Sequence, residues 1–189
     1  MHGKALFLDI DGCLNWDKSK SYCVSNNIYY LGIDNIRVKR LAQIVNATDA
    51  KIVLTSDWGI RFDIGTYKQT DKHAKYLSNK LRKQGLKVYD KIDWYDFKRP
   101  DRGFAILDWL DKHPEIIEYV VIDDEYFWGY NEIPLKDHMI HCFSDNGEEY
   151  SGLTDNLVTH AIDILNNGAR GFFVDEDGLA KMKSIWGTR

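Results

Sequence analysis

The sequence predicts a three-layer α/β sandwich, in which a central, mostly parallel sheet of about five strands is covered by helices on both faces. Two observations predict this class. Short apolar runs recur along the chain, and between them lie segments whose apolar residues repeat every three to four positions. The runs are apolar throughout rather than alternating, which is typical of strands buried on both faces. With 189 residues, the chain has the usual size of one domain, so we expect residues 1–189 to form a single domain.

Helical segments lie between most of the expected strands. The expected strands are Ala5–Ile10, Lys51–Thr55, Val88–Tyr89, Tyr119–Ile122 and His138–Phe143. The expected helices are Asp34–Ala47, Asp71–Gln84, Arg102–His113 and Leu153–Asn166. Capping residues support these bounds, because Asp34 can accept hydrogen bonds from a first helical turn and Gly168 can adopt the left-handed conformation that ends a helix.

Two segments outside these elements need separate interpretation. Residues 12–33 are polar and aromatic and directly follow the first strand, so we expect an irregular flap beside a functional site. Residues 171–189 are expected to form a C-terminal extension. This extension is either an added strand and helix on the core or a contact with another subunit.

The composition excludes several classes of protein. Hydrophobic residues make up 44% and charged residues 29%, which is typical of a globular rather than a disordered chain. No apolar run approaches the roughly 20 residues that span a bilayer, and the first strand begins too early for a signal peptide. We therefore expect a cytoplasmic protein without a membrane partner. The three cysteines show no CxxC spacing, so neither a disulfide framework nor a zinc site is indicated.

The net charge of −4 argues against broad electrostatic binding to a nucleic-acid backbone. It does not exclude a local basic surface. One group of basic residues falls on and beside the second predicted helix: Lys68, Lys72, Lys75, Lys80, Arg82 and Lys83. We interpret this group as a solvated helix face, with a nucleic-acid contact as the alternative.

The residues just past the predicted strands form a coherent chemical set, and ligands of parallel sheets bind at these strand ends. The set consists of Asp9 and Asp11 after the first strand, Thr55, Ser56 and Asp57 after the second, and Asp123, Asp124 and Glu125 after the fourth. Uncompensated carboxylates in one crevice would repel one another, so acidic residues at two strand ends predict a hard cation. Mg²⁺ fits best.

Asp9 and Asp11 are two positions apart and precede Gly12, which permits a sharp turn of the backbone. Both carboxylates can therefore face one phosphorus atom. One can attack while the other transfers the proton of the leaving oxygen, which gives an aspartyl-phosphate that water later hydrolyses. The alternative is a turn with solvated acids. A calcium loop is disfavoured, because Cys13 and Leu14 follow where further oxygen ligands would be needed.

Four segments resemble, in order, the four motifs of the haloacid dehalogenase-like phosphatases. They are the DxDGxL start at Asp9, the strand ending in Thr55-Ser56, a basic residue that opens a helix, and the strand ending in Asp123-Asp124. Val53–Gly59, Arg102-Gly103, Tyr119–Asp124 and Gly152–Thr154 are further similar to a small capless branch that is associated with RNA-repair proteins. The resemblance implies a Rossmann-like sandwich with little or no cap domain.

The resemblance also implies roles for the first two motifs. Asp9 would be the nucleophile and would bind Mg²⁺ through its second carboxylate oxygen. Asp11 would be the general acid and base, with its backbone carbonyl on the metal. Thr55 would hold a phosphoryl oxygen, together with the backbone N–H of Ser56. We expect the substrate to pass close to Gly12 as well.

The third and fourth motifs leave alternatives open. The resemblance implies that Asp123 completes the metal site, directly or through water, with Asp124 as a helper. The third motif commonly carries a lysine, and the candidates here are Lys98, Arg99 and Arg102. We favour Arg102 because it opens a predicted helix, and an arginine keeps the positive charge and can hold phosphate oxygens bidentately. Lys98 is the alternative.

Trp58 and Trp128 are aromatic residues close to these strand ends, and they are candidates for substrate binding. A base stacked on an aromatic ring is worth about 1–3 kcal/mol, so a nucleotide could be held in this way. Packing in the core is the alternative role for both rings.

The intervals between the motifs are too short for a folded lid, and an open site suits a phosphate on a large body. We therefore predict an Mg²⁺-dependent phosphatase that acts on a nucleic-acid end or a phosphoprotein, with nucleic-acid repair as the context. One alternative is a nucleotide or small-metabolite phosphatase that the flap of residues 12–33 gates. Another is a binding module that keeps the fold without catalysis. The sequence indicates no obligate protein partner.

Overall fold

The computed structural model of the protein describes residues 3–16, 18–25, 28–96, 101–143 and 151–168. In these residues, five parallel strands form one sheet in the order β5-β4-β1-β6-β7. The strands are β1 (Gly3–Leu8), β4 (Lys51–Leu54), β5 (Val88–Lys91), β6 (Ile116–Asp123) and β7 (Met139–His141). Each overlaps a strand expected from the sequence, so the predicted fold class is confirmed.

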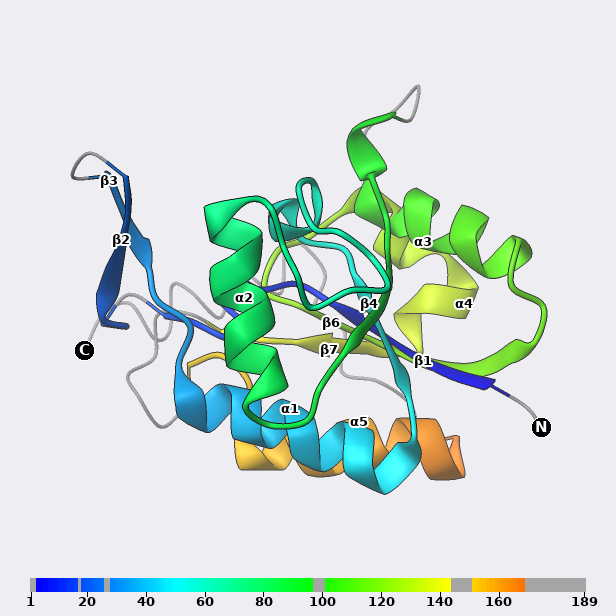
Figure 1. The fold of residues 1–189 in the computed structure, drawn as a ribbon. Helices are drawn as coiled ribbons and strands as arrows, with labels where there is room; N and C mark the ends of the chain where they lie inside the picture. The colour runs from blue at the N-terminus through cyan, green and yellow to red at the C-terminus, as the bar shows by residue number, and fades with distance from the viewer. Residues whose placement is uncertain (1–2, 17, 26–27, 97–100, 144–150, 169–189) are drawn as a thin grey trace.

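Helices cover both faces of this sheet, as Figure 1 shows. The core divides accordingly, because successive residues of a strand point to opposite faces. On β1, Leu6 and Leu8 belong to a cluster with residues of α1 (Asn35–Thr48), α2 (Lys72–Arg82) and α5 (Asp155–Asn167). Ala5 and Phe7 belong to a second cluster with α3 (Arg102–Asp111) and α4 (Ile133–Lys136). No helix in the described ranges combines the length and the apolarity needed to cross a bilayer.

Helix ends follow the capping residues in the sequence. Asp34 Oδ1 accepts a hydrogen bond from the Ile36 backbone N–H at 2.7 Å, which starts α1 one residue after the expected position. Gly168, with φ at +66°, ends α5 in the left-handed conformation. Four residues of the chain, Ile133–Lys136, form the short helix α4, which the sequence did not predict. It is too short to show an apolar period.

The prediction of an irregular flap over residues 12–33 was wrong in part. The segment contains an antiparallel hairpin of β2 (Ser21–Ser25) and β3 (Ile28–Leu31), which projects from the rest of the chain at the left of Figure 1. The hairpin pairs only with itself and forms its own two-stranded sheet. β3 is a short run of apolar and aromatic residues, so the sequence carried a strand signal here that the prediction of an irregular flap overlooked. The predicted extension at 171–189 lies outside the described residues.

The connections between strands place a crevice at one edge of the central sheet. From β1 the chain proceeds outward to β4 and β5, and then it crosses to the opposite side of β1 for β6 and β7. The strand order thus reverses at β1, and a crevice forms outside the carboxyl ends of strands at such a reversal. Three 3₁₀ turns surround this edge: η1 (Asp57–Gly59), η2 (Trp94–Asp96) and η3 (Trp128–Asn131).

Candidate active site

The ends of β1, β4 and β6 bring three predicted site residues together. The Asp9 N–H donates to the Ile122 carbonyl at 2.9 Å, and the Thr55 N–H donates to the Leu8 carbonyl at 3.0 Å. The backbone ladders therefore continue one residue past β1 and β4 and fix where these side chains begin. Asp9 is 4% exposed, and Thr55 and Asp123 are fully buried.

Arg102 joins two of these carboxylates. Its Nη1 lies 2.9 Å from Asp9 Oδ1 and 2.6 Å from Asp123 Oδ2. The Tyr130 hydroxyl donates to the same Asp123 oxygen at 2.5 Å, and the Glu125 N–H donates to Asp123 Oδ1 at 2.9 Å. Both oxygens of Asp123 are therefore engaged by the protein itself, and Asp123 holds Arg102 against Asp9.

The position of Arg102 depends on a close contact between the start of α3 and η3. Asp101 caps α3, because its Oδ1 accepts from the Gly103 N–H at 2.8 Å, and it also accepts from the Gly129 N–H. A Cβ on Gly103 would lie 2.5 Å from the Gly129 carbonyl carbon, closer than real Cβ atoms approach. Two glycines thus allow this approach. Of the third-motif candidates, Arg102 occupies the site, and Lys98 and Arg99 lie outside the described residues.

Two buried donors of the site have no hydrogen-bond partner in the part of the chain that the structure describes. They are the Thr55 hydroxyl and Arg102 Nε. Leaving a buried donor unsatisfied costs about 1–3 kcal/mol, so such groups are rare unless a ligand uses them. The guanidinium is also enclosed by aromatic rings, with its Cζ 5.3 Å from the centre of Trp94 and 4.6 Å from that of Phe127. Both donors suit a phosphoryl group beside Asp9.

The site carries perturbed carboxylates. Burial, and next the charge of Asp123, raise the pKa of Asp9 well above its ordinary value, although Arg102 opposes the shift. Burial and the charges of Asp123 and Glu125 raise the pKa of Asp124 to about 7. Burial alone would lower the pKa of Arg102, but Asp123 and Asp9 outweigh it and raise that pKa. The site thus holds more negative charge than Arg102 compensates, which favours a bound cation.

A cation position is suggested by ligand atoms of Asp9, Cys13 and Asp124, which lie within 4.8 Å of one another. Burial raises the pKa of the Cys13 thiol, which therefore stays protonated and is a poor ligand for a hard cation. The two carboxylates fit Mg²⁺, which prefers oxygen. The structure therefore favours Asp124 as the metal ligand, whereas the sequence favoured Asp123 with Asp124 as a helper.

Gly12 sits directly against this cation position. Its φ is +68°, in the left-handed region that glycine adopts without strain. A Cβ on Gly12 would lie 1.8 Å from Asp124 Oδ2, so no other residue leaves that carboxylate in place.

Asp11 lies on the solvent side of the crevice and is exposed. Asn15 Nδ2 donates to its Oδ1 at 2.6 Å, and the Trp58 indole N–H donates to its Oδ2 at 2.9 Å. Asn15 Oδ1 also accepts from the Gly12 N–H at 2.9 Å, so one amide fixes both the turn and the carboxylate. Asp11 is therefore held in one orientation.

The two tryptophans predicted to bind substrate differ in exposure. Trp58 is 4% exposed and packs on His73 with ring centres 3.6 Å apart, so the structure favours its positioning of Asp11 over stacking on a base. Trp128, in η3, is 69% exposed and stays a candidate for substrate contact. Ser56 is buried and accepts from the Trp58 N–H, which caps η1.

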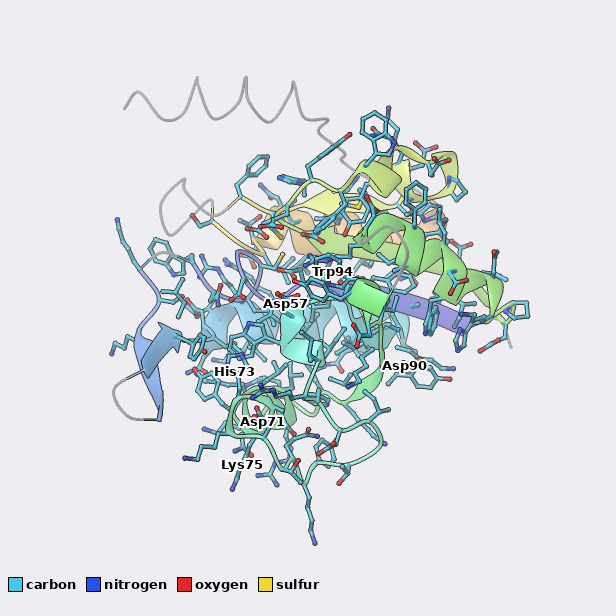
Figure 2. The ribbon with its side chains drawn as sticks, turned by 90° about the horizontal axis from the view of Figure 1, so that it is seen from above. Asp57, Asp71, His73, Lys75, Asp90 and Trp94 are labelled. Atoms are coloured by element: carbon cyan, nitrogen blue, oxygen red, sulfur yellow. The ribbon has the colours of Figure 1, made fainter. Side chains whose placement is uncertain are left out.

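The β4 side of the crevice is lined by polar and aromatic residues. Asp57 accepts a hydrogen bond from the Tyr95 hydroxyl at 3.0 Å, and Tyr95 stacks on Trp94 with ring centres 3.9 Å apart. Figure 2 shows Asp57 and Trp94 on neighbouring turns, with His73 of α2 on the other side of Asp57.

Three residues of the site were missed by the sequence reasoning: Asn15, Asp101 and Tyr130. Asn15 follows Asp11 by four residues, and Asp101 directly precedes a predicted helix, so turn and capping signals were present for both. Tyr130 gives no such signal. Its role depends on the path of the chain after β6, which brings its hydroxyl back to Asp123.

A five-stranded parallel sheet with acidic residues at its point of reversal is the fold that the resemblance to the haloacid dehalogenase (HAD)-like phosphatases implied. The family described as "HAD domain in Swiss Army Knife RNA repair proteins" matches residues 5–156. The chain belongs to this family. A comparison with curated proteins gave no significant match.

Comparison with solved structures gives distant similarity to HAD hydrolases. One is described as a HAD superfamily hydrolase of subfamily III A from Legionella pneumophila. It has 13% identity and a TM-score of 0.46, over 87% of this chain and 82% of that one. A structure described as a HAD family hydrolase from Streptomyces avermitilis has 12% identity and a TM-score of 0.42, over 86% of this chain and 90% of that one. A structure described as a 3-deoxy-D-manno-octulosonate 8-phosphate phosphatase from Vibrio cholerae has 12% identity and a TM-score of 0.45, over 87% and 83%.

Proposed function

We propose that this chain is an Mg²⁺-dependent phosphatase that removes a phosphate from a nucleic-acid end through an aspartyl-phosphate at Asp9. One observation carries the proposal. Asp9 is buried beside Arg102, and the site contains two buried donors without a partner in the described residues, Thr55 Oγ1 and Arg102 Nε. A phosphoryl group would satisfy both donors and place phosphorus within reach of the Asp9 carboxylate.

In the first step, a carboxylate oxygen of Asp9 attacks phosphorus, and the bond from phosphorus to the leaving oxygen breaks. Asp11 donates its proton to that oxygen, which departs as the alcohol of the shortened substrate. Asn15 and Trp58 support this role, since they hold both oxygens of Asp11 in a fixed orientation. Thr55 and Arg102 would stabilise the negative charge on the phosphoryl oxygens.

In the second step, Asp11 accepts a proton from a water molecule, whose oxygen attacks phosphorus. The bond between phosphorus and the Asp9 oxygen breaks, so inorganic phosphate leaves and the carboxylate of Asp9 is restored. The proton that Asp11 gave up in the first step is thereby regained, and the two carboxyl groups return to their initial state.

Asp9 and Asp124 would hold Mg²⁺, since their carboxylate oxygens gather at one point. When bound, the cation supplies positive charge that neutralises the carboxylates and the incoming phosphate. It would also keep Asp9 ionised, against the raised pKa that burial produces.

Two observations support a nucleic-acid end as the substrate. Among the described residues, the insertion after β1 contains one hairpin, β2–β3, and the solvent-side acid Asp11 is exposed. An open crevice of this kind admits a phosphate at the end of a large molecule. The family to which the chain belongs is described by its occurrence in RNA repair proteins.

The test is a measurement of phosphate release from RNA and DNA oligonucleotides with terminal phosphates, from nucleotides and sugar phosphates, and from p-nitrophenyl phosphate. We expect Mg²⁺-dependent turnover that is fastest on an oligonucleotide end and falls to background in Asp9→Asn. The matched control is Asp108→Asn, which removes the same charge from an exposed position on α3.

Retained activity in Asp9→Asn would contradict the aspartyl-phosphate mechanism. Turnover of oligonucleotide ends no faster than that of p-nitrophenyl phosphate would contradict the proposed substrate, and preference for a free nucleotide or sugar phosphate would favour the metabolite alternative. Absence of all turnover in the presence of Mg²⁺ would favour a binding module.

A further inference from the structure

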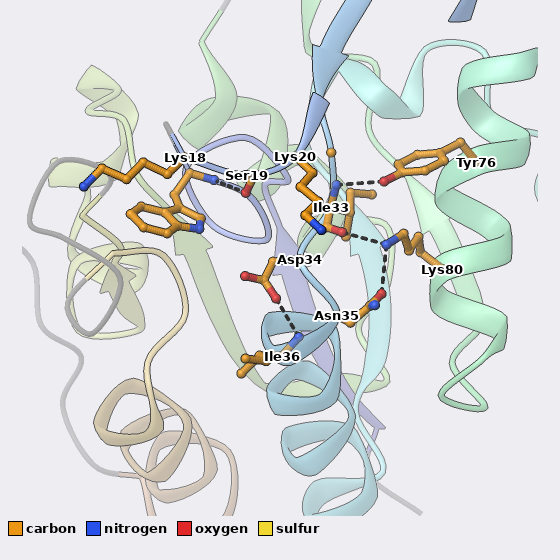
Figure 3. Close-up of a pocket in the computed structure, with 11 residues that line it drawn as sticks. Lys18, Ser19, Lys20, Ile33, Asp34, Asn35, Ile36, Tyr76 and Lys80 are labelled. Carbon is orange, nitrogen blue, oxygen red and sulfur yellow. Dashed lines mark hydrogen bonds between the residues drawn. The ribbon is translucent and has the colours of Figure 1, made fainter. Parts of the chain in front are cut away.

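A cavity of about 670 Å³ lies outside the catalytic crevice. It is formed by the base of the β2–β3 hairpin, the start of α1 and the exposed edge of α2, as Figure 3 shows. We call it the lysine pocket, and the residues of its wall that matter here are Trp16, Lys18, Lys20, Tyr76 and Lys80.

Three lysines line the lysine pocket, and Figure 3 shows the Lys18 side chain at the rim, pointing away from Lys20 and Lys80. Lys18 and Lys20 are exposed, and across the described segments neither has a carboxylate partner within ion-pair distance. Lys80 Nζ donates to the Ile33 carbonyl at 2.9 Å and to Asn35 Oδ1 at 2.8 Å. An ammonium has three N–H donors, so Lys80 is held in place by two and keeps one for a ligand.

The pocket also contains one acid, Asp34, but its charge is compensated. Asp34 Oδ2 lies 2.7 Å from Arg37 Nη1, and Asp34 Oδ1 accepts from the backbone N–H of Ile36. The carboxylate is thereby used to cap α1 and to pair with a buried arginine. The pocket keeps a positive charge in a chain whose net charge is −4, and this favours an anion as its ligand.

Aromatic rings lie beside these lysines. Lys18 Nζ is 5.7 Å from the ring centre of Trp16, and Lys80 Nζ is 5.5 Å from that of Tyr76. Trp16 is only 7% exposed, so it supports the wall of the pocket, whereas the half-buried Tyr76 leaves part of its ring open to a base. Cations beside an accessible aromatic ring are typical of surfaces that bind single-stranded nucleic acid, because phosphates pair with the cations and a base packs on the ring. An acidic peptide would use the cations alone.

Two short connections join the lysine pocket to the catalytic crevice. Trp16 follows Asn15 in the sequence, and Asn15 donates to Asp11 at 2.6 Å. On the other side, the ring centre of Tyr76 is 6.3 Å from that of Trp58, whose indole N–H also donates to Asp11. A strand whose end lies at Asp9 and which leaves past Asp11 would meet the lysine pocket within a few nucleotides.

We propose that the lysine pocket binds an internal phosphodiester of the single-stranded nucleic acid whose terminal phosphate is removed at Asp9. The inference rests on the proposed function and adds a second contact that selects a polymer over a mononucleotide. It also revises the interpretation of Lys80, which the sequence placed on a solvated helix face.

The experiment measures binding of a 5′-hydroxyl, 3′-hydroxyl RNA oligonucleotide to the full chain by fluorescence anisotropy at several salt concentrations. Each phosphate contact on a single strand contributes about 0.7 to the slope of log affinity against log salt. The double variant Lys18→Ala/Lys20→Ala should lower the slope by about 1.4, and Lys80→Ala by about 0.7. Between about 50 and 200 mM salt, the wild type should therefore lose about sevenfold more affinity than the double variant.

The matched control is Lys72→Ala/Lys75→Ala, which removes the same two charges from exposed positions of α2 outside the pocket. Lys18→Arg/Lys20→Arg keeps the charges and should retain the wild-type slope, so a change of slope caused by misfolding would be recognised. In activity assays, the ratio of kcat/KM for a phosphorylated oligonucleotide to that for p-nitrophenyl phosphate should fall in the alanine double variant and not in the control.

Equal slopes in the alanine variants and the control would overturn the inference, even if the wild type shows Asp9-dependent phosphatase activity. A slope change without any phosphatase activity would support the pocket as a nucleic-acid site and contradict the proposed function. Competition by an acidic peptide as strong as that by RNA would overturn the inference in favour of a protein ligand.

Discussion

The two sides of the crevice around Asp9 are built differently. On the β6 side, Arg102, Asp123 and Tyr130 form a buried network in which the arginine joins two carboxylates. On the β4 side, Asp11 is exposed and is oriented by neutral donors from Asn15 and Trp58. The buried side fixes the charge and position of Asp9, our proposed nucleophile, whereas the exposed side orients Asp11, our proposed proton donor. We therefore expect mutations on the two sides to affect different steps.

The largest effect is expected when the buried network is broken. Arg102→Met leaves Asp9 and Asp123 buried without their cation, and breaking a buried ion pair costs about 3–5 kcal/mol. Urea unfolding measures this loss in the free energy of unfolding. Phosphatase activity should fall by about 10²-fold or more, because Arg102 would stabilise charge on the phosphoryl group.

Arg61→Met is the control for the same substitution at the surface, where the ion pair with Asp71 is long and exposed. Such a pair contributes about 0–1 kcal/mol. Similar losses of stability in the two variants would show that the network around Arg102 does not stabilise the fold.

The second prediction concerns removal of Mg²⁺ at different pH. Without the cation, the folded chain binds a proton at Asp124 up to about pH 7, whereas the unfolded chain releases it near 3.8. This contribution to stability is present below pH 3.8 and is lost as the pH rises through about 7. Mg²⁺ competes with this proton, so it should raise the melting temperature more at about pH 8 than at about pH 5.5.

At 100 times its dissociation constant, Mg²⁺ adds about 2.7 kcal/mol to the free energy of unfolding. Thermal unfolding with Mg²⁺ and with a chelator measures the difference. Asp124→Asn should remove most of the stabilisation. If Mg²⁺ stabilises that variant as much as the wild type, Asp124 is not a ligand.

The smallest effect is expected on the exposed side. Trp58→Phe keeps an aromatic ring against His73 but removes the N–H that orients Asp11, and water can replace that donor at an exposed carboxylate. We expect a loss of stability of about 1–2 kcal/mol, because the smaller ring also leaves space in the core where the buried indole packed. Turnover should fall about tenfold for an alkyl phosphate and less for an aryl phosphate, because an aryl oxide departs with less help from an acid.

Equal losses on alkyl and aryl phosphates would contradict the positioning of a proton donor by Trp58. His73→Ala is the companion variant, since it removes the packing on the Trp58 ring without touching the N–H. Its effect on turnover should be the smaller of the two.

The central sheet and its helices could be predicted because the signals for them lie within each element or directly beside it. Burial on both faces requires continuous apolar runs, and helix ends follow caps such as Asp34 and Gly168, so the expected bounds lie within a few residues of the observed ones. The β2–β3 hairpin was missed although β3 is a run of four apolar and aromatic residues. Its strands pair with each other outside the central sheet, so the alternation of strands and helices gave no place for them.

The sequence alone could not show which of Asp123 and Asp124 is available to bind a cation. The two acids are adjacent, and neighbouring residues at a strand end point in different directions. Our proposal of Asp124 as the cation ligand depends on residues far away in the sequence: Arg102 and Tyr130 engage Asp123, and Gly12 leaves room for Asp124. The acidic residues at these strand ends could be predicted from the sequence. Which side chains contact one another could be seen only in the folded chain.

The contact between Gly12 and Asp124 has an evolutionary consequence. A side chain at position 12 would occupy the space of the carboxylate at position 124, so substitutions at the two positions depend on each other. A larger residue at 12 would be tolerated only with a smaller one at 124, and that exchange would give up the proposed cation ligand. In related chains, the loss of this glycine should therefore mark the loss of metal-dependent catalysis as reliably as the loss of an aspartate.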